Sequence, residues 1–121
     1  EEVSMAIQPV VVTPNLPSVQ AFYEQVLGAT EVFRYPSDGP VFYKTLKIGD
    51  AELGLVAEEA DVSAPPRITL SVDVPDVDAL LPLVEPAGGR VQGPSNDMPW
   101  GQRVAHVFDP DGNPVNLTQS L

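Results

Sequence analysis

Few side chains in this sequence are suited to chemistry. The 121 residues include a single histidine, His106, and no cysteine. Reactive thiolates, disulfides and sites built on two imidazoles of one chain are therefore excluded. The candidates for a general base are Glu52, Asp73 and His106, and Arg67 could stabilise an oxyanion that develops beside one of them. Sequence spacing brings no pair of these together, and a lone histidine within a strand usually packs or faces solvent.

Two loops carry further candidate residues. The segment DPDGN at positions 109–113 opens like a calcium-binding loop, but the twelfth position of such a loop would be Ser120 instead of Glu. We therefore predict a tight hairpin turn at this segment. Trp100 follows Met98 and Pro99 in a loop rich in Pro and Gly, where it either packs or covers the apolar mouth of a cleft.

The charge balance of the chain is strongly acidic. The 17 Asp and Glu residues outnumber the 6 Lys and Arg residues, which gives a net charge of −11. This charge disfavours nucleic-acid binding and favours cationic partners, unless it only keeps the surface soluble. No apolar run approaches the roughly 20 residues of a membrane span, and the acidic start Glu1-Glu2 differs from a signal peptide. We expect a cytoplasmic protein without membrane contact, with Met5 as its natural start.

The elements that must position these residues come in two similar halves. In the first half, apolar residues recur at three- and four-residue spacing between Pro17 and Gly28, which predicts an amphipathic helix of about three turns. Runs of β-branched and aromatic residues bounded by Pro, Gly and Asp predict strands around this helix. The predicted strands are residues 7–13, 30–35, 41–48 and 52–57.

The second half repeats this order after a segment that resembles a linker. Residues 58–66 are rich in acidic residues, Ser and Pro, which suit neither a helix nor a central strand. A helix is predicted at residues 76–85, shortened or kinked by Pro82, and Gly88-Gly89 takes the place that Gly28 has in the first half. Strands are predicted at residues 67–73, 90–92, 104–108 and 114–118. A repeat at half the chain length indicates two like units that pack a shared sheet.

The strands alternate between apolar and polar residues. This alternation predicts one strand face against the helices and one polar face away from them. The other face is either the wall of a concave cleft or an ordinary solvent-facing sheet. The residues predicted to meet the helices are Leu53, Leu55, Ile68, Leu70, Val72, Val115 and Leu117.

Four segments in this order resemble one superfamily over nearly the whole chain. They are FYEQVLG at 22–28, Gly88-Gly89, WGQR at 100–103 and DPDGN at 109–113. Together they resemble the glyoxalase, bleomycin-resistance protein and extradiol dioxygenase superfamily, also called vicinal oxygen chelate proteins. The resemblance implies an α+β fold in which two βαβββ modules form a curled mixed sheet with a concave cleft and helices on the convex face. It also implies a homodimer, in which both chains can line each cleft.

The resemblance further implies a single domain over residues 5–121, with module one at 5–57, the linker at 58–66 and module two at 67–121. It maps the metal-ligand positions of the superfamily's enzymes onto Gln8, Gly54, Arg67 and Asn116. Two neutral amides, a glycine and a cation cannot replace the water around a divalent ion. We therefore expect neither a metal nor another cofactor in this chain.

The resemblance favours a non-catalytic protein that sequesters an antibiotic-like or aromatic ligand, as bleomycin-resistance proteins do. The net charge suits a cationic ligand, whereas Arg67 points to a carboxylate, phenolate or carbonyl on it. An alternative is a metal-independent lyase, isomerase or hydrolase that uses one of the bases named above, and a third is a protein-interaction module. Tyr43 is a further stacking candidate. The candidate ligand-binding residues are Gln8, Phe33, Tyr35, Phe42, Gly54, Arg67, Thr69, Trp100 and Asn116.

Overall fold

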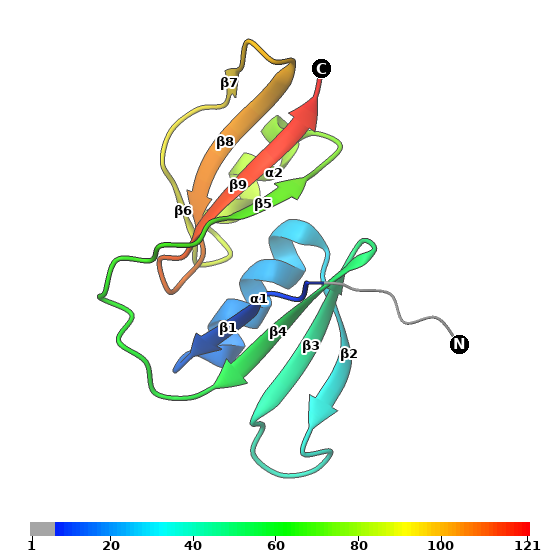
Figure 1. The fold of residues 1–121 in the computed structure, drawn as a ribbon, viewed down its shortest axis with the longest axis vertical. Coiled ribbons are helices and arrows are strands. Elements are labelled where there is room, and N and C mark those ends of the chain that lie inside the picture. Colours follow the sequence, from blue (N-terminus) through cyan, green and yellow to red (C-terminus); the bar gives the residue numbers. More distant parts are fainter. Residues whose placement is uncertain (1–6) are drawn as a thin grey trace.

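The structure is a computed structural model that describes residues 7–121. The predicted start at Met5 lies outside the described residues. Within them, a βαβββ unit is followed by a second unit of the same order with one additional short strand (Figure 1). No helix among the described residues has both the length and the apolar character to cross a membrane.

The first module contains β1 (Val10–Thr13), α1 (Leu16–Leu27), β2 (Thr30–Tyr35), β3 (Tyr43–Ile48) and β4 (Ala51–Ala57). Helix α1 has a proline in its first turn and ends at Gly28, whose left-handed φ of 68° lets its N–H reach the Glu24 carbonyl at 3.1 Å. The sheet order is β1-β4-β3-β2, with β1 parallel to β4 and the other pairs antiparallel.

The second module contains β5 (Leu70–Asp73), α2 (Val77–Val84), β6 (Arg90–Val91), β7 (Asn96–Asp97), β8 (Gln102–Phe108) and β9 (Pro114–Ser120). Asp76 caps α2 by accepting a hydrogen bond from the Ala79 N–H at 3.2 Å. The helix has only 8 residues and contains Pro82, in agreement with the predicted short helix. The sheet order is β5-β9-β8-β6, and β7 pairs with β8.

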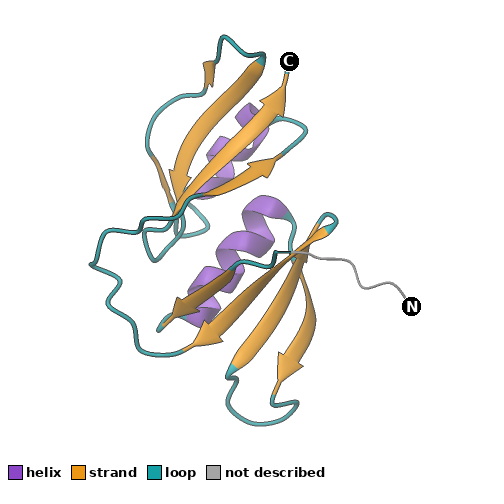
Figure 2. Ribbon diagram, in the orientation of Figure 1, coloured by secondary structure: helices purple, strands orange, loops and turns teal. Residues whose placement is uncertain are grey.

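Both helices lie on the same side of the two sheets (Figure 2). One hydrophobic core joins α1, α2 and the inner faces of both sheets. The predicted inner residues of β4 and β9 are buried in this core, namely Leu53, Leu55, Val115 and Leu117. Leu70 and Val72 of β5 pack against it and are half-buried. The predicted α+β fold with helices on one face is confirmed, but the strands form two mixed sheets instead of one shared sheet.

A buried hydrogen bond joins the two modules. The Tyr23 hydroxyl on α1 donates to Asp109 Oδ2 at 2.9 Å, and burial together with this carboxylate raises the pKa of Tyr23 well above its usual value. Asp109 Oδ1 also accepts from the N–H groups of Asp111 and Asn113 at 3.0 and 2.9 Å. The segment 109–113 is therefore the predicted turn between β8 and β9, and it fastens the second module to the helix of the first.

One residue that was predicted to face the helices is exposed instead. Ile68 is 78% exposed, so the prediction that it meets the helices is wrong. Strand β5 is parallel to β9 and begins with Leu70 opposite Val115, so the residue before it would face Pro114. Proline has no N–H for the ladder, and the strand begins only after that position. Residues 58–69 therefore form an exposed connection between the modules.

Candidate functional site

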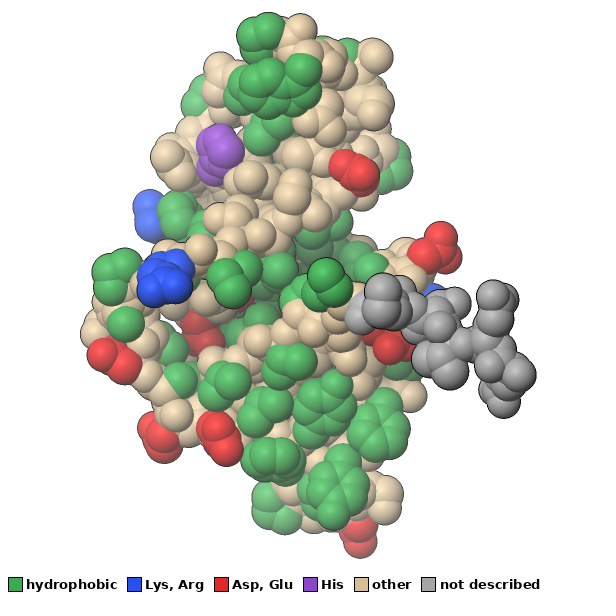
Figure 3. All heavy atoms as spheres, in the orientation of Figure 1, with side chains coloured by type: hydrophobic (Ala, Val, Ile, Leu, Met, Phe, Trp, Pro, Cys, Tyr) green, Lys and Arg blue, Asp and Glu red, His purple; other side chains and the backbone are tan. Residues whose placement is uncertain are grey.

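The outer face of the first sheet carries exposed apolar side chains. Strand register aligns Phe33, Thr45, Gly54 and Val10 in one row across β2, β3, β4 and β1. The next row contains Tyr35, Tyr43, Val56 and Val12. Hydrophobic side chains gather over these strands on the face turned away from the helices (Figure 3). We call this surface the apolar face. Its most exposed large members are Tyr35 at 60%, Phe33 at 51% and Val10 at 50%.

A hydrogen-bonded cluster lies within the apolar face. Gln8 Nε2 and Thr45 Oγ1 both donate to the Tyr43 hydroxyl, at 3.2 and 3.1 Å. Gly54 lies beneath the Tyr43 ring, since a Cβ added to Gly54 would be 2.9 Å from the Tyr43 hydroxyl oxygen. The ring of Phe33 lies beside that of Tyr43 with centroids 6.1 Å apart. Two predicted site residues, Gln8 and Gly54, are thus brought together, with Tyr43 between them.

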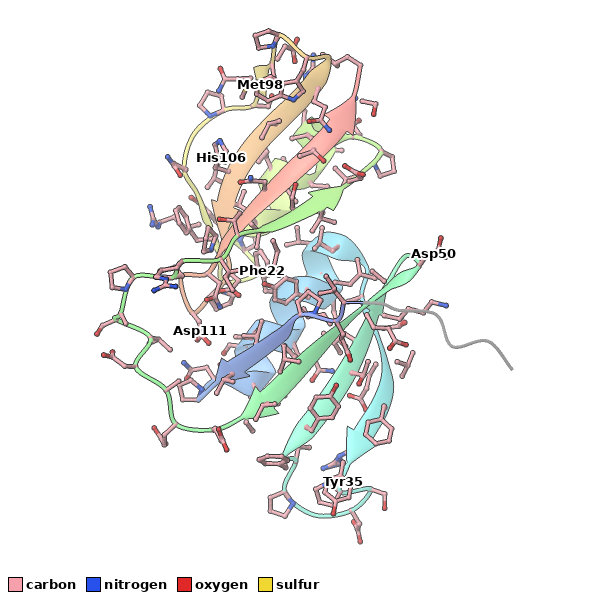
Figure 4. All side chains as sticks on the ribbon, in the orientation of Figure 1. Phe22, Tyr35, Asp50, Met98, His106 and Asp111 are labelled. Atoms are coloured by element: carbon pink, nitrogen blue, oxygen red, sulfur yellow. The ribbon has the colours of Figure 1, made fainter. Side chains whose placement is uncertain are left out.

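The outer face of the second sheet is polar. Register aligns Ser71, Asn116 and His106 across β5, β9 and β8, and places Asp73 beside Thr118 in the next row. His106 Nδ1 lies 2.7 Å from Asn116 Oδ1, and the Thr118 hydroxyl donates to Asp73. We call this surface the polar face. It lies on the same side of the molecule as the apolar face, and His106 is exposed on it (Figures 3 and 4).

An open groove of about 900 Å³ lies between the two modules. Its lining combines apolar side chains of α1, β4, β5 and α2, such as Val26, Leu53 and Leu80, with the three acids Asp50, Glu52 and Asp73. Asp50 is at the tip of the β3–β4 turn (Figure 4). Two of the predicted general bases, Glu52 and Asp73, therefore line one groove, and the third, His106, lies outside it.

Other predicted site residues lie away from the apolar face. Arg67 and Thr69 are exposed in the connection between the modules. Trp100 is 69% exposed, and its indole N–H donates to Gln102 Oε1 at 2.9 Å. Met98, two residues before it, lies at the opposite end of the molecule from Tyr35 (Figure 4). One chain therefore does not place Trp100 over the aromatic side chains of the first module.

Several cations are held by local partners. Lys44 lies 2.7 Å from Glu31 on the neighbouring strand, and this hydrogen bond lowers the pKa of the Glu31 carboxyl. Arg103 lies 2.8 Å from Asp97 and 3.0 Å from Asp78, and its hydrogen bond lowers the pKa of Asp97. The Arg90 guanidinium lies 4.3 Å from the centre of the Phe108 ring. None of these three cations lines the groove, whose charged lining residues are all acidic.

The residues that the resemblance maps onto the superfamily's metal positions do not fit a metal ion. Gly54 has no side chain, and the Tyr43 ring fills the space where one would stand. Gln8 contacts Tyr43, and the Asn116 carbonyl oxygen contacts His106. Arg67 would repel a cation. Between residues 7 and 121, no three His, Cys, Asp or Glu side chains form a group that could hold a metal.

Sequence reasoning missed part of this geometry. Tyr43 was expected only to stack, and neither its hydrogen bonds nor Thr45 was predicted. The alternation of Tyr43 and Thr45 on β3 was a usable signal, since residues two apart share a strand face. The pairing of these residues with Gly54 needed the register between β3 and β4, which the sequence does not show.

Comparisons with known proteins agree with this geometry. The family model of the Glyoxalase/Bleomycin resistance protein/Dioxygenase superfamily matches residues 6–117. A protein named putative glyoxylase CFP32 from Mycobacterium tuberculosis is 36% identical over 92 residues, which is 76% of this chain. The chain spans only 35% of the length of that relative.

Solved structures share the fold at low sequence identity. TioX from Micromonospora sp. ML1 has a TM-score of 0.76 and 20% identity, with 97% of each chain covered. A bleomycin resistance determinant encoded on the transposon TN5 has a TM-score of 0.71 and 24% identity, over 97% of this chain and 98% of that one. The fosfomycin resistance protein FosX from Listeria monocytogenes has a TM-score of 0.77 and 15% identity, over 99% of this chain and 96% of that one. From the family match over residues 6–117 together with this shared fold, the chain belongs to the Glyoxalase/Bleomycin resistance protein/Dioxygenase superfamily.

Proposed function

We propose that this protein binds a planar, antibiotic-like aromatic molecule on the apolar face and holds it without converting it. The observation that carries this proposal is the exposure of Phe33 and Tyr35, together with Val10 and Val12, in two adjacent rows on one side of a single sheet. Phe42, directly before β3, is exposed as well. A contiguous exposed apolar patch of this kind marks a binding surface in soluble proteins. Aromatic rings supply stacking faces for a flat ligand.

The chemistry of the site supports binding without conversion. The residues that the resemblance maps onto the superfamily's metal positions do not fit a metal. The metal ion that acts as the electrophile in the superfamily's metal-dependent reactions would therefore lack ligands in this chain. The net charge of −11 favours a ligand that carries a positive charge. Two similar structures are named for resistance to bleomycin and fosfomycin, which supports an antibiotic as the ligand class.

We propose further that two copies form a homodimer in which each cleft is completed by the second chain. Strands β1 and β5 are sheet edges, each paired on one side only within the described chain. An unpaired edge beside an apolar groove favours association. A second copy that paired at these edges would bring a polar face, with Asn116 and the Trp100 loop, toward an apolar face. In this arrangement Arg67, Thr69, Trp100 and Asn116 join Gln8, Gly54 and the aromatic residues as ligand-binding candidates.

Sedimentation equilibrium tests the dimer. We expect twice the chain mass of 12.9 kDa at micromolar concentration. A monomer at all accessible concentrations contradicts the shared cleft, but not binding to the apolar face itself.

Calorimetric titration tests ligand binding. Bleomycins, anthracyclines, mitomycins and quinoxaline peptides are the probes, and we expect one of these classes to bind. Phe33→Ala should weaken that binding about tenfold, because an aromatic stack contributes roughly 1 kcal/mol beyond its buried area. Leu83→Ala is the matched control, since Leu83 is an exposed apolar residue of α2. Absence of heat with all four classes, or equal losses in both variants, contradicts the proposal.

The contact between His106 and Asn116 favours a second candidate, a metal-independent lyase or isomerase. If the Asn116 carbonyl accepts from Nδ1, the neutral imidazole keeps Nε2 free as a general base on the polar face. Incubation with methylglyoxal and a thiol, followed by proton NMR, tests this candidate. It predicts turnover that His106→Gln abolishes, and a wild-type protein without turnover argues against this reaction.

A further inference from the structure

We infer that the Tyr43 hydroxyl anchors the ligand by donating a hydrogen bond, at the position where a metal-ligand side chain would otherwise lie. This inference rests on the proposed function and names the ligand chemistry of that site. The ligand is a flat, largely apolar molecule with a neutral carbonyl oxygen at its edge. Gly54 is the residue that makes room for the anchoring tyrosine.

The first argument is steric. A Cβ at Gly54 would lie 2.9 Å from the Tyr43 hydroxyl oxygen, 3.1 Å from its Cε1 and 3.2 Å from a Val10 methyl carbon. Even the smallest side chain at Gly54 would therefore have to push the ring aside. Because Gly54 takes the fourth-strand metal position, the phenol and a metal-binding carboxylate exclude each other at this place.

The second argument is the direction of the hydrogen bonds. The Tyr43 oxygen accepts from Gln8 and from Thr45, which occupies both of its lone pairs. Between residues 7 and 121, no carboxylate or carbonyl oxygen lies within hydrogen-bond distance of the Tyr43 hydroxyl, and its hydroxyl partner Thr45 can rotate to act as the donor. A hydroxyl that accepts two hydrogen bonds is polarised into a stronger donor. Its proton is therefore available to an acceptor atom of a bound molecule.

The third argument is the charge around the hydroxyl. Along the same face, the row next to Thr45 and Gly54 pairs Lys47 with Glu52, one cation opposite one anion. The hydroxyl therefore has balanced charges near it and no surplus cation to neutralise a carboxylate or a phosphate. The apolar side chains beside it are Phe33, whose ring centroid lies 6.1 Å from that of Tyr43, and Val10, whose methyl group lies near Gly54. This combination selects a neutral carbonyl on an aromatic body.

Xanthone and xanthene form a matched pair of probes for this donor. They share a three-ring frame with the same ring oxygen, which is planar in xanthone and nearly planar in xanthene, and only xanthone carries a carbonyl oxygen. Binding of each to the full chain is measured by equilibrium dialysis. We expect the wild type to prefer xanthone about tenfold, the factor that one net hydrogen bond of roughly 1.4 kcal/mol produces. Tyr43→Phe should bind both probes equally, with the affinity for xanthene unchanged.

Thr30→Val is the control, because it removes an exposed hydroxyl from β2 opposite Lys47 on the same sheet face, and Thr30 is not among the candidate binding residues. This variant should keep the preference for xanthone. Gly54→Ala should lose the preference, because the added methyl group displaces the Tyr43 hydroxyl. Circular dichroism and thermal unfolding verify that each variant is folded before dialysis.

The outcomes separate this inference from the proposed function. A preference for xanthone that survives in Tyr43→Phe overturns the inference, and so does equal binding of both probes to the wild type. In these two cases the chain still binds a flat aromatic molecule, so the proposed function stands. If neither probe binds the wild type, the inference falls, and the antibiotic titration then decides the proposed function.

Discussion

The two modules share one architecture but carry opposite chemistry on their outer faces. In both, the central strands β4 and β9 turn leucines into the common core, with Leu55 and Leu117 fully buried. On the other side, the first module exposes aromatic and aliphatic side chains, whereas the second presents His106, Asn116 and Asp73. The repeat therefore preserves what folding requires and leaves the outer faces free to diverge.

The two outer faces also differ in how their polar side chains are hydrogen-bonded. On the polar face, His106 contacts Asn116, and Thr118 donates to Asp73, so side chains satisfy one another across strands. On the apolar face, the Tyr43 hydroxyl accepts hydrogen bonds from Gln8 and Thr45, and its own proton can be donated to a ligand. The apolar face thus has both uncovered hydrophobic area and an unused donor, and these features suit a ligand.

Equivalent core truncations test whether the inner faces of the modules are alike. Leu55→Ala and Leu117→Ala should each lower the free energy of unfolding by about 2–5 kcal/mol, because each removes a fully buried leucine side chain. Urea unfolding monitored by circular dichroism measures both. A loss below about 1 kcal/mol in one variant only would show that the modules do not share one cooperative core.

Equivalent outer positions should respond differently. Gly54 on β4 and Asn116 on β9 occupy corresponding sites, yet only Gly54 lies beneath a ring. Gly54→Ala should destabilise the protein by about 1–2 kcal/mol through the displaced Tyr43 and its two hydrogen bonds. Asn116→Ala should cost less than about 1 kcal/mol, since it only frees the exposed His106. Equal losses in urea unfolding would contradict the packing of Tyr43 against Gly54.

Ligand affinity should depend on the apolar face more than on the polar one. For a ligand found in the antibiotic titration, Tyr35→Ala should weaken binding about tenfold while changing stability by less than about 1 kcal/mol, because Tyr35 is exposed. His106→Ala should change affinity less than threefold if the ligand is held and not converted. Calorimetry measures both affinities, and the reverse order would move the binding site to the second module.

The smallest expected effect concerns the ion pair of the first module. The Lys44 hydrogen bond lowers the pKa of the Glu31 carboxyl below its usual value. A lowered folded-state pKa stabilises the fold above the unfolded-state value, and this contribution is lost as the pH falls through the lowered pKa. Lys44→Met should raise the Glu31 pKa in an NMR titration and reduce stability near neutral pH by at most about 1 kcal/mol. An unchanged Glu31 pKa would contradict the ion pair.

Much of the fold was predictable because local patterns report burial. Apolar spacing between Pro17 and Gly28 predicted α1, and the alternation in β4 and β9 predicted their buried leucines. The same alternation was wrong for Ile68, because the ladder between β5 and β9 stops at a proline on the partner strand. The two-residue strand β7 was too short to produce a pattern at all.

The candidate site was predictable only in its parts. The resemblance mapped Gln8 and Gly54 onto metal positions, and the structure places both of them against Tyr43. It placed Arg67 at the head of a strand, whereas the structure has it in the exposed connection. Asn116 lies on the second sheet and Trp100 in the loop between β7 and β8, so neither is part of the apolar face of the first sheet.

The sequence by itself determined the element order, the inner strand faces and the lack of thiol or paired imidazole chemistry. These properties follow from residue types and from periods of two and 3.6, which need no knowledge of distant partners. Only the tertiary structure decided which outer residues meet. Register across β2, β3 and β4 placed the Tyr43 ring over Gly54, and the packing of α1 against the second module placed Tyr23 on Asp109. Such contacts depend on pairings between residues far apart in the chain, and no local pattern encodes them.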